Sequence, residues 1–240
     1  MTEMAWVLGL GLLFGLKHAT EVDHVVAVST IVSRHRNVMR SALVGAMWGV
    51  GHTASLLIIG VIVLSLRVAI PERVSAWLEF GVALMIIGLG AAALWRALYK
   101  REDVHVHEHS HDGVPHIHVH FHESQTRHTP ARSHNHAISA VGLKPMLIGT
   151  MHGLAGSGAL TLLVLTQIES AWVGFFYLLI FGLGSIVGMI LMSGLIGLPF
   201  ALTTRNVGAV HRHLQTAAAV LSIAFGVWYA YDKGFSSGLF

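Results

Sequence analysis

The stretch Gly15-Leu-Lys-His-Ala-Thr-Glu-Val-Asp-His24 places five ionisable side chains inside an apolar segment that extends from about residue 4 to residue 33. They are Lys17, His18, Glu21, Asp23 and His24. If the segment crosses a bilayer, each charged side chain near its middle costs about 3 kcal/mol. Ionisable side chains at that depth are expected to have a function. Imidazole and carboxylate groups together are ligands for divalent metals such as nickel, cobalt and zinc.

The spacing of these ligands does not suit one regular helix. At about 100° per residue, the side chains of His18 and Asp23 would point about 140° apart, and those of His18 and His24 about 120° apart. The sequence therefore predicts either a first membrane helix that is broken near the motif, or ligands that serve different neighbours. The purely structural alternative is a buried polar network that joins helices, with Lys17 and Glu21 as an ion pair.

The composition is that of an integral membrane protein. Of the 240 residues, 54% are hydrophobic and 11% are charged, whereas soluble domains contain about 25% charged residues. Apolar runs long enough to cross about 30 Å of hydrocarbon occur near residues 4–33, 41–66, 76–98, 143–168, 172–198 and 213–231. We therefore expect an all-α membrane protein with six transmembrane helices. Because the chain has no cysteine, metal ligands must be nitrogen, oxygen or methionine sulfur.

The basic residues predict the orientation in the membrane. Eleven of the 15 lysines and arginines fall in the first, third and fifth connections, and Arg67, Arg73 and Lys233 fall on the opposite side. Since positive residues gather on the cytoplasmic side, we expect both termini outside and the long third connection in the cytoplasm. A bacterial-type inner or plasma membrane fits this pattern. The net charge of +3 then needs no nucleic acid as a partner, and the lipid bilayer is the expected one.

An internal repeat divides the chain. The matches are Gly15-Leu-Lys-His18 with Gly149-Thr-Met-His152, Gly49-Val-Gly51 with Gly182-Leu-Gly184, and Leu94-Trp95 with Val227-Trp228, at offsets of 133 or 134 residues. The sequence thus predicts two three-helix repeats, residues 1–100 and 142–240, separated by a loop over residues 101–141. Because three is odd, the second repeat would be inverted, as in many secondary transporters whose binding sites lie at the membrane midplane.

Two further histidines fall at membrane depth. His52 lies near the middle of the second span, and His152 lies in the fourth, where the repeat pairs it with His18. The repeat pairs His52 with Ser185. A lone histidine on an apolar helix is more often a hydrogen-bonded core residue than a ligand. Their depth, close to that of the motif, makes both candidate metal ligands, with Ser185 in a supporting role.

The third connection is rich in histidine. Eleven histidines lie within residues 105–136, and eight of them alternate in two runs. These are His105, His107, His109 and His111, then His116, His118, His120 and His122. Asp112-Gly113 between the runs is a hairpin-turn signal, which would set His109 opposite His116, His107 opposite His118 and His105 opposite His120. The alternative is a disordered polar tract. In either case clustered histidines favour metal binding.

The motif resembles the signature of the nickel/cobalt transporter (NiCoT) family, which has a histidine, four residues and Asp-His, preceded by Gly-Leu and a basic residue. Gly51-His52-Thr53 is similar to that family's Gly-His-Ser/Thr motif in the next helix. The family usually has Asp at Glu21 and Arg at Lys17. The second half also departs from the better-known members, with Gly153, Gly156, Ser157 and Gly158 after His152, and so resembles a shorter, urease-associated subgroup.

The resemblance implies a secondary metal permease that needs His18, Asp23 and His24. We expect His18, His24 and His52 as nitrogen ligands and Asp23 as an oxygen ligand. His152 would complete the site, Glu21 would adjust charge or carry a proton, and Lys17 would partly neutralise the site.

The expected cargo is Ni²⁺ or Co²⁺, with Zn²⁺ and Mn²⁺ as alternatives, no permanently bound cofactor, and a cytoplasmic metal acceptor protein as a candidate partner. Uptake is favoured over efflux because an efflux signature has Pro-Gly where this chain has Val22-Asp23. The alternatives are efflux, an intramembrane zinc hydrolase and a metal store that uses only the loop.

Overall fold

The computed structural model describes residues 2–66, 70–99, 103–111, 114–122, 142–155, 170–203, 208–236 and 239–240. Nearly all of these residues are helical. The α-helices are α1 (Thr2–His18), α2 (Val22–Val32), α3 (Val38–Leu66), α4 (Glu72–Tyr99), α5 (Lys144–Leu154), α7 (Ala171–Leu202) and α8 (Gly208–Tyr231). A π-helical turn, η2 (Asp232–Ser236), extends α8, and β1 (Asp103–His111) and β2 (Val114–His122) form a hairpin.

Four helices in the described part of the chain are long and apolar enough to cross a membrane. They correspond to α3, α4, α7 and α8, and they make the chain an integral membrane protein. Each coincides with one of the six expected spans. The first expected span is two short helices, α1 and α2. The fourth is represented by α5, and its remaining residues, with Gly156, Ser157 and Gly158, lie outside the described residues. Six spans therefore remain a prediction.

The predicted break in the first membrane segment is confirmed, and it falls within the motif. After α1 ends at His18, the amide of Thr20 donates to the carbonyl of Lys17, and the amide of Glu21 donates to the carbonyl of His18. These bonds turn the chain, and Glu21 is extended (φ −63°, ψ 146°) before α2 begins. Asp23 in the first turn of α2 is favourable beside the positive end of the helix dipole.

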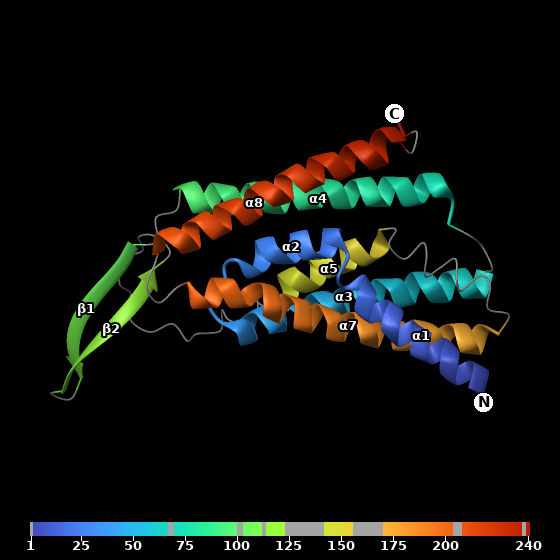
Figure 1. The fold of residues 1–240 in the computed structure, drawn as a ribbon, viewed down its shortest axis with the longest axis horizontal. Coiled ribbons are helices and arrows are strands. Elements are labelled where there is room, and N and C mark those ends of the chain that lie inside the picture. Colours follow the sequence, from blue (N-terminus) through green and yellow to red (C-terminus); the bar gives the residue numbers. More distant parts are fainter. Residues whose placement is uncertain are drawn as a thin grey trace.

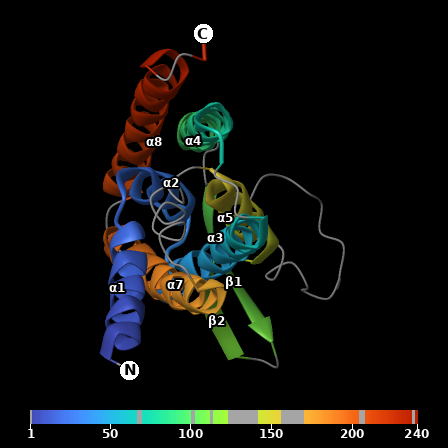
Figure 2. The same cartoon turned by 90° about the vertical axis from the view of Figure 1, so that its right-hand side faces the viewer.

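The helices form two layers joined by α2. One layer contains α3, which packs along α5 and α7, together with α1, which packs along α7. The other layer is the pair of α4 and α8, which lies above the rest in Figure 1 and reaches the top of the view in Figure 2. Helix α2 contacts α4, α7 and α8. Its apolar residues Val28 and Val32 belong to a core that also contains Trp48 of α3 and Ile86 of α4, so α2 is held at the interface of the layers.

The histidine-rich connection contains the predicted hairpin. Strands β1 and β2 are antiparallel, with His105 opposite His120, His107 opposite His118 and His109 opposite His116. This register is the predicted one. The turn residues 112–113 lie outside the described residues. The hairpin extends from one end of the molecule, whereas both chain termini lie toward the other end (Figure 1).

Candidate metal site

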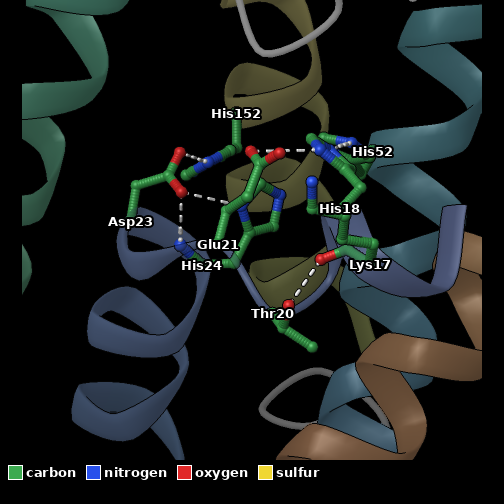
Figure 3. A network of polar contacts seen from close by, with 8 residues as sticks. All are labelled: Lys17, His18, Thr20, Glu21, Asp23, His24, His52 and His152. Carbon is green, nitrogen blue, oxygen red and sulfur yellow. Dashed lines mark hydrogen bonds and ion pairs between the residues drawn. The ribbon is translucent and has the colours of Figure 1, made fainter. Parts of the chain in front are cut away.

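The five expected metal ligands meet at the break between α1 and α2 (Figure 3). His18 is the last residue of α1, and Asp23 and His24 lie in the first turn of α2. His52 lies in the middle of α3, and His152 lies in the last turn of α5. The four histidines are between 0% and 3% exposed. Four separate helices therefore bring their imidazoles to one buried point. On a single regular helix, the side chains of the motif alone could not converge in this way.

The first-half histidines converge through ring nitrogens. The Nε2 atoms of His18 and His52 lie 2.9 Å apart, and the ring centroids of His18 and His24 are 4.5 Å apart. Two imidazole nitrogens at this distance either share one proton or face a common cation. Since metal–nitrogen bonds of about 2.0–2.1 Å at right angles would separate two ligand atoms by about 2.9 Å, the spacing suits a shared metal ion.

Asp23 joins the other two imidazoles. Its Oδ1 accepts from the backbone amide of His24 at 2.9 Å and lies 3.0 Å from Nδ1 of the same residue. Its Oδ2 lies 2.9 Å from Nε2 of His152. A carboxylate between two imidazoles can either bind a metal directly or fix the tautomer and orientation of ligands that bind it. Asp23 is thus the point where α2 and α5 are tied together.

Among the supporting residues, Glu21 has the clearest contact. Its Oε2 lies 3.1 Å from Nδ1 of His18, and its side chain is 42% exposed. The carboxylate therefore pairs with His18 rather than with Lys17, whose carbonyl accepts from the Thr20 hydroxyl. Ser185 is fully buried in α7, and its hydroxyl has no hydrogen-bond partner among the described residues.

These side chains form two groups that could hold a metal ion. One consists of His18, His24 and His52, and the other of Asp23, His24 and His152. Within each group the ligand atoms lie within 4.8 Å of one another. In the described part of the chain, Nε2 of His24 and the Nδ1 atoms of His52 and His152 have no hydrogen-bond partner. Buried polar atoms normally have partners, so these nitrogens are available to a ligand.

The sequence reasoning did not include Trp48, which forms a wall of the site. Its indole ring stacks on His24, with ring centroids 6.0 Å apart and 9° between planes, and it meets His152 edge-on at 5.6 Å. Trp48 is fully buried. The available signal was its position four residues before His52, which puts both side chains on one face of α3.

Among the histidines whose side chains the structure describes, no others join this cluster. The side chains of the hairpin histidines lie outside what the structure describes, so metal binding by the hairpin remains a prediction. His35 lies in the connection after α2, where burial and then the positive charges of Arg34 and Arg40 lower its pKa below the ordinary value. His35 is therefore neutral at neutral pH.

The chain is similar to known proteins. The chain is 38% identical to urease accessory protein UreH of Bacillus sp. (strain TB-90), over 99% of this chain and 96% of the relative. The chain belongs to the UreH family. This UreH-family chain is also 24% identical to chloroplast proteins FOR GROWTH AND FERTILITY 1 and 2 of Arabidopsis thaliana, of which the aligned regions cover 61% and 54%. No family model and no solved structure matches.

Proposed function

We propose that this UreH-family protein is a secondary permease that carries Ni²⁺ or Co²⁺ across the membrane through the buried site at the α1–α2 break. The observation that carries the proposal is the convergence of four buried imidazoles and one carboxylate from four helices. Ionisable groups inside a membrane protein are costly and mark ion pathways. A cluster of metal ligands at a helix break is the arrangement in which secondary transporters bind their ions.

The ligand chemistry favours borderline divalent cations. Imidazole suits zinc, copper, iron and nickel, whereas sites made only of oxygen suit magnesium, calcium and manganese. The motif's resemblance to the nickel/cobalt transporters of the urease-associated subgroup selects Ni²⁺ or Co²⁺ among them. The name of the UreH relative, a urease accessory protein, agrees with that subgroup. The proposal includes no catalytic activity and no resident cofactor, because the metal ion is the cargo.

Helix packing supports the two inverted repeats on which alternating access would depend. A Cβ added at Gly15 would collide with the carbonyl oxygen of Phe181, and one added at Gly149 would collide with the carbonyl oxygen of Trp48. The repeat offsets relate Gly15 to Gly149 and Phe181 to Trp48, so the second contact is the repeat equivalent of the first. They also relate the close contact of Gly51 with Met146 to that of Gly184 with Leu12. The repeat partners α3 and α7 run in opposite directions, as do α4 and α8 (Figure 1).

The proposed orientation puts the hairpin in the cytoplasm and both termini outside. The hairpin and the termini lie at opposite ends of the molecule, and the basic residues gather in the connections at the hairpin end. Since the membrane potential contributes about 2.3 kcal/mol per charge per 100 mV, it would draw a divalent cation inward. Paired histidine strands would then hold incoming ions weakly for a cytoplasmic acceptor protein.

The experiment measures Ni²⁺ and Co²⁺ entry into liposomes that contain the purified protein and an internal metal indicator. We expect wild-type flux and at least about a tenfold loss in Asp23→Ala, since a ligand is removed from a buried site. The matched control is Glu72→Ala, because Glu72 is an exposed acidic residue that also lies in the first turn of its helix.

Equal flux in Asp23→Ala, Glu72→Ala and wild type would contradict the proposal. Efflux of the same ions would use the same site, and the direction of flux under an imposed potential in oriented vesicles distinguishes the two.

A further inference from the structure

The arrangement of ligands within the site implies more than one position for the ion. Building on the proposed permease function, we infer that the transported cation occupies two successive positions that share His24. The first position is formed by His18, His24 and His52, and the second by Asp23, His24 and His152.

His24 can serve both positions because its two ring nitrogens have different surroundings. Nδ1 lies 3.0 Å from Oδ1 of Asp23, on the side of the second group. Nε2 has no hydrogen-bond partner among the described residues. The ring of His24 is 4.5 Å from that of His18 and 4.2 Å from that of His152, whereas the rings of His52 and His152 are 6.0 Å apart. His24 is thus the central imidazole, and His52 and His152 are the outer ones.

The two positions differ in ligand chemistry and in exposure. The first offers three imidazoles, and the second offers two imidazoles and the carboxylate of Asp23. His18 of the first position contacts Glu21, whose side chain is 42% exposed, while that of Asp23 is 13% exposed. The first position is therefore the one next to an exposed carboxylate, where a cation enters or leaves. The second has a carboxylate among its own ligands and is therefore more strongly attractive to a cation.

The two positions also differ in the halves of the chain that form them. His18, His24 and His52 come from α1, α2 and α3, all within the first half. The second position adds His152 from α5, in the second half. Relative motion of the halves would leave the first position intact and would make or break the second. The first half of the chain therefore binds the ion at the first position. Transfer of the ion to the second position then engages the second half.

Matched double variants of the full-length protein test this assignment. His18→Ala/His52→Ala removes two ligands of the first position and none of the second. His52→Ala/His152→Ala also removes two imidazoles, but one from each position. We expect the first double variant to bind Ni²⁺ within about tenfold of the single variant His52→Ala, and the second to bind at least about tenfold more weakly than the first.

Isothermal titration with Ni²⁺ gives the affinities of the variants. If one site uses all five ligands, the two double variants will lose affinity equally, and that result overturns the inference. If an alanine double variant does not elute as a folded monodisperse protein, the double variant with glutamine at the same two histidines is measured in its place. Absence of wild-type flux would refute the permease proposal, whereas the binding pattern of the variants judges the two positions separately.

Discussion

At the scale of single residues, Glu21 is the side chain whose role the contacts define most clearly. Its Oε2 lies 3.1 Å from Nδ1 of His18, and Nε2 of the same ring faces His52. Partners that orient a metal-binding histidine in this way are worth about 10–100-fold in metal affinity. We expect Glu21→Ala to weaken Ni²⁺ binding about tenfold. Glu21→Gln, whose amide oxygen still accepts a hydrogen bond, should retain most of the affinity.

Titration calorimetry and liposome flux measure both variants. Thr20→Val is the neighbouring control, since the Thr20 hydroxyl donates to the Lys17 carbonyl at an exposed position. Equal losses in the Ala and Gln variants would show that the charge of Glu21 matters and its hydrogen bond does not. No loss in either would remove Glu21 from the site.

The sequence identified the residues of the metal site but not the ring nitrogen that each histidine presents. His18, Asp23, His24, His52 and His152 could be chosen because ionisable groups are rare in apolar segments, and the structure brings all five together. The ring nitrogen that each histidine presents depends on the partner of the other nitrogen, and this is a property of packing. The same limit explains why Trp48 was missed, since an aromatic residue on an apolar helix gives no signal of its own.

At the scale of elements, the close packing of α1 on α7 depends on glycines, among them Gly15. A Cβ at Gly15 would meet the backbone of Phe181 and Ser185, and backbone atoms cannot turn away as a flexible side chain can. We expect Gly15→Ala to destabilise the protein by about 1–3 kcal/mol, the usual cost of overpacking. Gly149→Ala should have a similar effect because the repeat gives it an equivalent contact with Trp48.

Thermal unfolding of the detergent-solubilised protein measures this effect. Gly81→Ala in α4 is the matched control, because nothing lies within 4 Å of a Cβ added there. Alanine is the better helix former by about 0.5–1 kcal/mol, so this variant should be at least as stable as wild type. A Gly15→Ala protein as stable as Gly81→Ala would show that α1 does not approach α7 so closely.

The helix break could be predicted, but the path of the chain after it could not. The angular argument predicted either a broken helix or ligands that serve different neighbours, and the structure has the break, between His18 and His24. The position of α2 between the two layers depends instead on its apolar residues, such as Val28 and Val32. Their side chains would suit lipid, α4 or α8 equally well, so the apolar pattern could not select the neighbours. Helix α2 consequently links the metal site to the α4–α8 pair.

At the scale of the whole molecule, the hairpin and the chain termini lie at opposite ends. We therefore expect them on opposite sides of the membrane. The chain has no cysteine, so one introduced cysteine can be labelled without background. Ser236 ends η2, near the C-terminus, and Ser110 lies in β1. With a membrane-impermeant maleimide on intact cells, we expect Ser236→Cys to be labelled. Ser110→Cys should be labelled only after the membrane is permeabilised, because the hairpin end carries most of the basic residues.

Each pattern of labelling has a distinct meaning, with the cysteine-free wild type as the control. If Ser110→Cys reacts in intact cells and Ser236→Cys does not, the protein has the opposite orientation, and the hairpin would meet metal ions before they reach the buried site. If both react from one side, the helices do not cross the membrane in the arrangement of Figure 1, and the two inverted repeats are lost. Labelling of Ser236→Cys alone retains both the repeats and a hairpin that receives ions on the cytoplasmic side.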